Sequence, residues 1–156
     1  MTTKVPDSFV NEQTVFFRRR VGWMDISAAV GLYQNGAIAF TVTEAIAYVD
    51  DTKAHVIVHL NPSAAGTANN PIYILLPVFL TPTAAAAALA YPLGNYTYHD
   101  GGAGIYYASA NYAGLVTGLP AIRGWAHLSG SPIGQTPNFA TALNDNVGIN
   151  LTYRLA

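Results

Sequence analysis

The strongest alternation of apolar and polar positions along the chain lies between residues 37 and 60. In its first half the large side chains recur at every second position, which is the period of a β-strand, and small residues fill the positions between them. The residues predicted to share this large face are Ile38, Phe40, Val42, Ile46 and Tyr48. A turn is predicted at residues 50–52, because Asp side chains accept hydrogen bonds from their own backbone. The return run, residues 53–60, places Val56, Val58 and Leu60 inward, so the pattern predicts a β-hairpin.

Glu44 interrupts the large face of this hairpin. Either it has a buried partner, or it marks a β-bulge that shifts the register of the two strands. We favour the bulge, because an unpaired buried carboxylate costs several kcal/mol.

Short β-prone segments separated by turn residues continue along the rest of the chain. Strands are predicted at residues 14–20 and 21–27 (both at sheet edges), 71–77 (in the core, between prolines), 121–128 and 147–154, with a meander from residue 94 that turns at 99–104 and 111–114. Residues 81–90 form either a short helix capped by Thr81 or a low-complexity loop. Eight to ten strands at this spacing predict an all-β, antiparallel β-sandwich of jelly-roll type.

The composition narrows the classes of function. Charged residues make up 10% of the chain and hydrophobic residues 51%, whereas ordinary soluble domains have about 25% charged residues. We therefore expect part of the surface to meet another subunit. A net charge of −1 gives no basic field that would attract nucleic acid. Without cysteines there is no thiolate nucleophile, and without a long apolar stretch we expect neither a signal peptide nor membrane insertion.

Histidines are the main candidates for chemistry. His55 and His59 would lie roughly 13 Å apart in a strand, too far to share one metal ion. His99 and Asp100 are a candidate acid/base pair, but no nucleophile motif accompanies them. The glycines at 101–104 lack the GK[ST] ending of a phosphate loop. We therefore predict no enzyme activity, no metal and no cofactor.

Aromatic residues dominate the second half of the chain and leave two alternatives open. They either form a platform on which sugars stack or pack against another subunit, because both uses favour amphipathic rings. The residues concerned are Tyr96, Tyr98, Tyr106, Tyr107, Tyr112 and Trp125. The shortage of surface charge favours subunit packing.

The N-terminal residues 1–13 are predicted to form an extended arm, followed by a single domain over residues 14–156. The arm has too little periodic structure to fold alone, so it should become ordered only against a partner surface. The predicted assembly interface comprises Phe9, Val10, Phe16, Phe17, Arg18 and Arg20. The alternative is a solvated edge strand whose arginines block edge-to-edge aggregation.

Several short motifs resemble the small jelly-roll modules of tailed-bacteriophage virion proteins. They are the basic strand leading to Gly22-Trp23, the Ile74–Pro77 run, Gly94-Asn95-Tyr96, the Gly124-Trp125 strand, and the closing Asn144–Val147 with Tyr153-Arg154. The resemblance covers residues 14–156 and rests on the spacing of the strands along the chain together with these short matches.

The resemblance implies a non-enzymatic virion protein, made in the host cytoplasm. It favours a homotrimeric capsid decoration protein, of cement or head-fibre type, that docks onto the major capsid protein or another virion protein. The alternative is a receptor- or carbohydrate-binding module of a minor tail protein, with a host surface glycan as partner.

Overall fold

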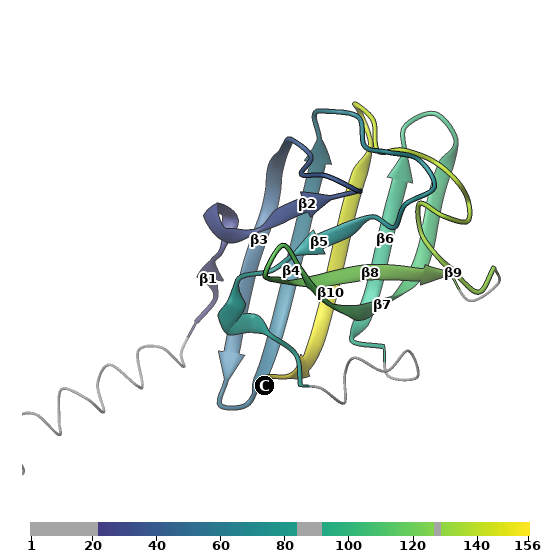
Figure 1. The fold of residues 1–156 in the computed structure, drawn as a ribbon. Helices are drawn as coiled ribbons and strands as arrows, with labels where there is room; N and C mark the ends of the chain where they lie inside the picture. The colour runs from purple at the N-terminus through teal and green to yellow at the C-terminus, as the bar shows by residue number, and fades with distance from the viewer. Residues whose placement is uncertain (1–21, 84–91, 127–128) are drawn as a thin grey trace, which may run out of the picture.

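The computed structural model describes residues 22–83, 92–126 and 129–156, whose regular structure is almost entirely β-strand (Figure 1). The strands are β1 (Met24–Asp25), β2 (Gly31–Tyr33), β3 (Phe40–Asp50), β4 (Lys53–Pro62), β5 (Tyr73–Leu75), β6 (Gly94–Asp100), β7 (Gly104–Val116), β8 (Leu119–Ala126), β9 (Ser131–Pro132) and β10 (Asn146–Arg154). Two single-turn 3-10 helices, η1 (Ser27–Ala29) and η2 (Val78–Leu80), interrupt them. The all-β prediction is confirmed. None of the helices in the described ranges is long and apolar enough to cross a membrane.

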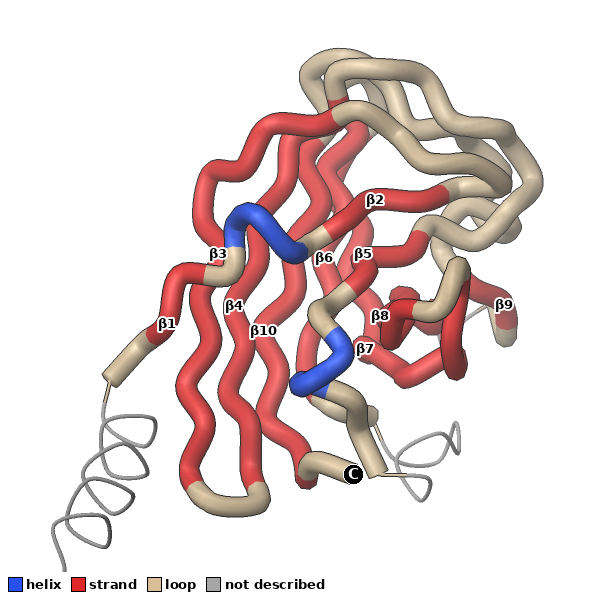
Figure 2. The backbone as a smooth tube through the Cα atoms, turned by 60° about the vertical axis from the view of Figure 1, so that its left-hand side comes forward, coloured by secondary structure: helices blue, strands red, loops and turns tan. Residues whose placement is uncertain are grey.

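The strands form one antiparallel sheet in the order β1-β3-β4-β10-β6-β7-β8-β5-β2, with β9 beside β8. The long strands β3, β4, β10, β6 and β7 lie side by side, and the shorter β8, β5 and β2 cross in front of them (Figures 1 and 2). The sheet thus curls into a half-barrel, and its strands are hydrogen-bonded continuously from β1 to β2.

The curl is accompanied by an irregularity in β7. The register with β8 shifts between Tyr112 and Leu115, and Gly114 has a positive φ of 91°. Bulges of this kind bend a strand and increase its twist. The turn predicted at residues 111–114 is therefore wrong, because β7 continues through these residues to Val116. The other predicted turn of the meander is confirmed between β6 and β7.

The hairpin of β3 and β4 is confirmed, and so is the bulge. The register shifts between Val42 and Glu44, and the Glu44 side chain is exposed. Val56, Val58 and Leu60 are fully buried, as predicted.

The prediction that Ile46 and Tyr48 share a face with Val42 is wrong. The residue added by the bulge reverses the alternation, so Ala45 and Ala47 are buried at 2% and 0% exposure. Ile46 and Tyr48 face outward and are only half-buried.

Other predicted elements are found with different roles. In the segment 71–77, Ile74 is buried, but Tyr73 is half-buried on the opposite face of β5. The second edge strand appears as β1 at one end of the sheet, while the last strand, β10, lies between β4 and β6 (Figure 1). The strand predicted at residues 14–20 and residues 84–90 of the predicted helix or loop lie outside the described residues.

The core fills the concave side of the half-barrel. Buried tyrosines reach across it from the long strands to the crossing segment: the Tyr96 hydroxyl donates to the Ile72 carbonyl at 3.2 Å, and the Tyr153 hydroxyl donates to the Leu80 carbonyl at 2.7 Å. Gly124 permits this close approach, because a Cβ there would lie 2.5 Å from a ring carbon of Tyr96. Hydrogen bonds as well as apolar contacts therefore connect the two layers.

Candidate functional site

The outer face of β2, β5 and β8 presents aromatic rings and one arginine. Tyr33 is the register partner of Tyr73, and Tyr73 is the register partner of Arg123. Two positions along β8, Trp125 lies on the same face, because alternate residues of a strand point the same way. We call these four half-buried residues, Tyr33, Tyr73, Arg123 and Trp125, the aromatic–arginine row.

The inner face of the same strands has the opposite character. Leu32, Ile74 and Ile122 are register partners directly beside the row, and each is at most 2% exposed. The inner face therefore closes the core. The outer face presents the half-buried row beside two buried residues, Leu75 and Ala121, which are 6% and 0% exposed.

Within the row the side chains contact one another. The rings of Tyr33 and Tyr73 have centroids 6.4 Å apart and are tilted by 48°. The Arg123 guanidinium carbon lies 5.0 Å from the ring centroid of Trp125, within the range of a cation–π contact. The Nε of Arg123 is buried and has no hydrogen-bond partner among the described residues.

The predicted sugar platform is only partly brought together. Tyr107 is 75% exposed on the outer face of β7, and it is a diagonal neighbour of Trp125, since Ser109 is the register partner of Trp125. Tyr106 points to the other face and packs against Phe139, with ring centroids 5.2 Å apart. Tyr96, Tyr98 and Tyr112 are 0%, 0% and 8% exposed and belong to the core, so their place in the platform was wrong.

Sequence reasoning missed Tyr33, Tyr73 and Arg123. Tyr33 directly precedes Gln34-Asn35-Gly36, a sequence typical of a turn, and Tyr73 stands inside the run 71–77 that was predicted to lie in the core. The available signal was the hydroxyl-bearing ring of Tyr73 between two isoleucines, which is typical of a strand with one exposed face.

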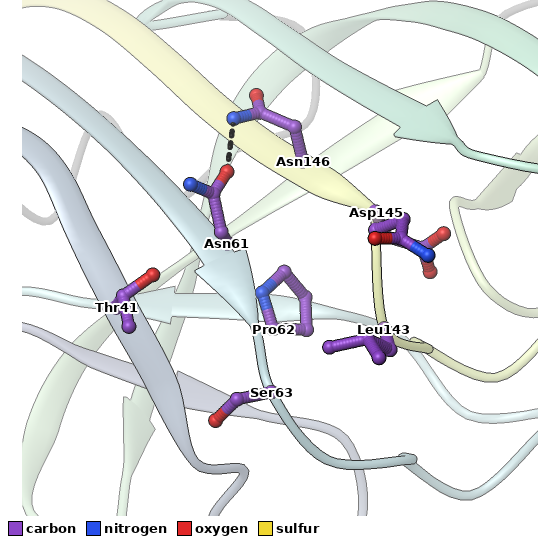
Figure 3. Close-up of a pocket in the computed structure, with 8 residues that line it drawn as sticks. Thr41, Asn61, Pro62, Ser63, Leu143, Asp145 and Asn146 are labelled. Carbon is purple, nitrogen blue, oxygen red and sulfur yellow. Dashed lines mark hydrogen bonds between the residues drawn. The ribbon is translucent and has the colours of Figure 1, made fainter.

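A second candidate is a polar hollow of about 400 Å³ at the end where β4 stops and β10 begins (Figure 3). Its lining consists of Thr41, Asn61, Pro62, Ser63, Leu143, Asn144, Asp145 and Asn146. The amide nitrogen of Asn146 donates to the amide oxygen of Asn61 at 2.7 Å (Figure 3), and Asn61 in turn donates to Thr43. The amides thus already bond to neighbours.

The carboxylate of the hollow, Asp145, serves the fold. It accepts hydrogen bonds from the Tyr98 hydroxyl, from the Gly101 amide at 3.0 Å and from the Ala142 amide at 2.6 Å. These bonds hold the loop before β10 against the turn between β6 and β7. With three donors around it, Asp145 is placed as an anchor for these segments and not as a base facing a substrate.

The three histidines in the described ranges, His55, His59 and His99, do not assemble a catalytic or metal site. His99 is exposed on β6, whereas the Asp100 carboxylate accepts from the Gly102 amide at 2.9 Å within the turn. Their side chains point to opposite faces, as neighbours in a strand do. His55 contacts the Thr152 hydroxyl at 2.9 Å. In the described ranges no three His, Asp or Glu side chains gather as metal ligands would.

A group of exposed apolar side chains lies at the end of the molecule where η2 meets β8. Val78, Phe79 and Leu115 are 62%, 55% and 62% exposed. They come from adjoining segments, because the Leu76 amide just before η2 donates to the carbonyl of Pro120, and Pro120 is the register partner of Leu115. We call these three residues the apolar end. The chain terminus lies beside it, where the Ala156 amide donates to the Thr81 carbonyl at 2.9 Å (Figure 2).

The predicted assembly residues of the arm, from Phe9 to Arg20, lie outside the described residues. No family model, no curated protein and no solved structure matches the chain.

Proposed function

We propose that the protein is a non-enzymatic structural component of a tailed-bacteriophage virion, a decoration protein that associates with itself, as a trimer, and with the capsid. In this proposal the half-barrel is a variant of the jelly-roll module. The arm, residues 1–13, and the basic strand after it, with Arg18 and Arg20, dock on the shell. The resemblance of the sequence motifs supports the assignment to a virion. The exposed apolar side chains of the described residues support the self-association.

The observation on which the proposal depends is the apolar end. Large side chains more than half exposed are unfavourable on a soluble monomer when they gather in one place. Phe79 and Leu115 do so on a chain with only 10% charged residues. Burial of such side chains against another subunit gains roughly 1.5–3 kcal/mol each, which favours an oligomer.

Light scattering and sedimentation with virions test the proposal together. We expect a mass close to three times 16.5 kDa in solution, and co-sedimentation with purified virions encoded by the same genome. Phe79→Ser combined with Leu115→Ser should reduce the mass toward the monomer, because polar side chains remove the apolar contact. Deletion of residues 1–13, or Arg18→Glu with Arg20→Glu, should release the protein from the particles.

The matched control is Leu143→Ser, since Leu143 is 69% exposed but lies at the polar hollow. It should leave both the mass and the sedimentation unchanged. A monomer that is absent from the virions contradicts the proposal.

A second candidate function is carbohydrate binding, as in a receptor-binding module of a tail protein. The observation that favours it is the shared outer face of Tyr107 and Trp125, which continues into the aromatic–arginine row. Rings on one face of a sheet stack on the apolar faces of sugars, and their polar groups supply hydrogen bonds.

A further inference from the structure

We propose that the aromatic–arginine row binds an acidic glycan, with Arg123 contacting the carboxylate of a sugar and the rings stacking on its neighbours. This inference rests on the carbohydrate-binding function proposed second and specifies its ligand class and its residues.

The row has the dimensions of a short binding subsite. Tyr33, Tyr73 and Arg123 occupy three adjacent strands in register, so the first and the last lie about 10 Å apart. The strands are short and firmly paired, which places the side chains on a rigid surface instead of on loops. A rigid row of rings suits an extended chain of sugars, because little side-chain entropy is lost on binding.

The charge distribution favours an anion. Arg123 is the only formally charged residue on β2, β5, β7, β8 and β9. The acidic residues of the described ranges lie elsewhere, on β1, β3 and β6 and in loops: Asp25, Glu44, Asp50, Asp51, Asp100 and Asp145. A single cation among aromatic rings, with no countercharge on its own strands, is complementary to a carboxylate carried by a ligand.

The surroundings of the guanidinium favour an anion as well. The guanidinium carbon lies 5.0 Å from the ring centroid of Trp125, and no described residue accepts a hydrogen bond from the buried Nε. A buried donor without an acceptor costs roughly 1–3 kcal/mol, so such atoms are uncommon unless a ligand or water completes them. A carboxylate accepts two parallel hydrogen bonds from the fork of an arginine, and it satisfies the buried Nε when the Arg123 side chain turns outward on binding.

Isothermal titration with paired ligands tests the inference on the unmodified protein. The probes are trigalacturonate and its methyl ester, and sialyllactose and its methyl ester. The members of each pair offer similar rings to the tyrosines, but only the first of each carries a carboxylate. We expect at least one acid to bind about tenfold or more tightly than its neutral counterpart, the ratio that one charge-assisted hydrogen bond supplies, and to weaken as salt is added.

Variants then assign the binding to the row. Arg123→Gln should lower the affinity for the acid about tenfold and leave that for the neutral partner unchanged, while Arg123→Lys should retain part of the preference. Tyr73→Ala should weaken both ligands of a pair. Arg154→Gln is the matched control, because Arg154 is exposed on β10 beside Lys53, outside the row. Far-ultraviolet circular dichroism confirms that each variant is folded.

The outcomes separate the two levels of the proposal. Binding of acid and neutral sugars with equal affinity, or binding that Tyr107→Ala abolishes and Arg123→Gln leaves intact, overturns the acidic-glycan site but retains carbohydrate binding. Binding of single-stranded DNA but of no glycan overturns both, and so does the absence of any binding.

Discussion

Gln34 is a buried amide that joins three loops at one end of the half-barrel. It is 1% exposed. Its Nε2 donates to the carbonyls of Asn70 and Phe139 at 3.0 and 2.9 Å, and its Oε1 accepts from the Thr141 amide at 3.0 Å. Gly66 leaves the space for it, since a Cβ there would lie 2.1 Å from Oε1. One side chain thus satisfies backbone groups from segments far apart in the sequence.

We predict that Gln34→Leu strongly destabilises the protein. Leucine has a similar volume but leaves two carbonyls and one amide buried without partners, so the free energy of unfolding should fall by about 3 kcal/mol or more. Urea unfolding measures this change. Gln135→Leu makes the same substitution on a half-buried side chain in the turn after β9 and should cost less than about 1 kcal/mol. Equal losses in the two variants would show that the hydrogen bonds of Gln34 contribute little.

Only part of the role of Gln34 was predictable from its neighbours in the chain. Asn35-Gly36 after it predicts a turn, and the structure confirms one, with Asn35 at a φ of 55°. The burial of Gln34 was not predictable, because its partners lie 36, 105 and 107 residues away and have no local pattern.

At the scale of elements, the bulge in β3 decides which side chains enter the core. Val42 is opposite Leu60 and Glu44 is opposite His59, so Thr43 is the extra residue. Without an extra residue, Glu44 would point inward and would be followed on that face by Ile46 and Tyr48. With it, the alanines enter instead, and the crossing strands have room to pack close to the sheet.

Deletions distinguish the bulge from the rest of the strand. Deletion of Thr43 should leave every side chain on its present face and cost only about 1–2 kcal/mol, in part through the lost hydrogen bond from Asn61. Deletion of Ile46 should abolish cooperative folding, because a shift by one residue turns one half of the strand over. Circular dichroism with urea unfolding compares the two variants. If both lose the same stability, the bulge does not set the faces.

The hairpin and its bulge were predictable from the sequence, because alternation and the cost of burying Glu44 are local properties. Which residues face inward beyond the bulge was not predictable. Large residues usually face the core, but here Ala45 and Ala47 do so. Three of the four residues of the aromatic–arginine row were missed for a related reason: the prolines around Tyr73 suggested a core strand, whereas Tyr73 is only half-buried.

For the whole molecule, the all-β class followed from the spacing of strands and turns, but the single curled sheet did not. Pairing of β4 with β10 and of β5 with β8 connects segments that are distant in the chain. Such pairing is selected by which faces fit together in the core, and strand-by-strand alternation does not specify it. The predicted assembly residues stay predictions, because they lie outside the described ranges.

Three tyrosines are buried in the core of the half-barrel, and they make the stability of the protein change with pH in the alkaline range. Burial raises the pKa of Tyr96 and of Tyr153. Burial raises the pKa of Tyr98 as well, and the hydrogen bond to Asp145 raises it further. The folded protein therefore keeps these protons at a pH where the unfolded chain, with an ordinary pKa of about 10, has released them. The resulting stability is fully present below pH 10 and is lost progressively above it.

We predict that the free energy of unfolding falls by about 4 kcal/mol between pH 9 and pH 11, since each of the three tyrosines contributes about 1.4 kcal/mol over this interval. Urea unfolding at a series of pH values measures the slope. Tyr153→Phe should reduce the slope by about a third, while it lowers stability at every pH through loss of the hydrogen bond to Leu80. Tyr107→Phe, at a side chain that is 75% exposed, should leave the slope as it is. An unchanged slope in Tyr153→Phe would mean that the folded state opens and hydrates this ring before it titrates.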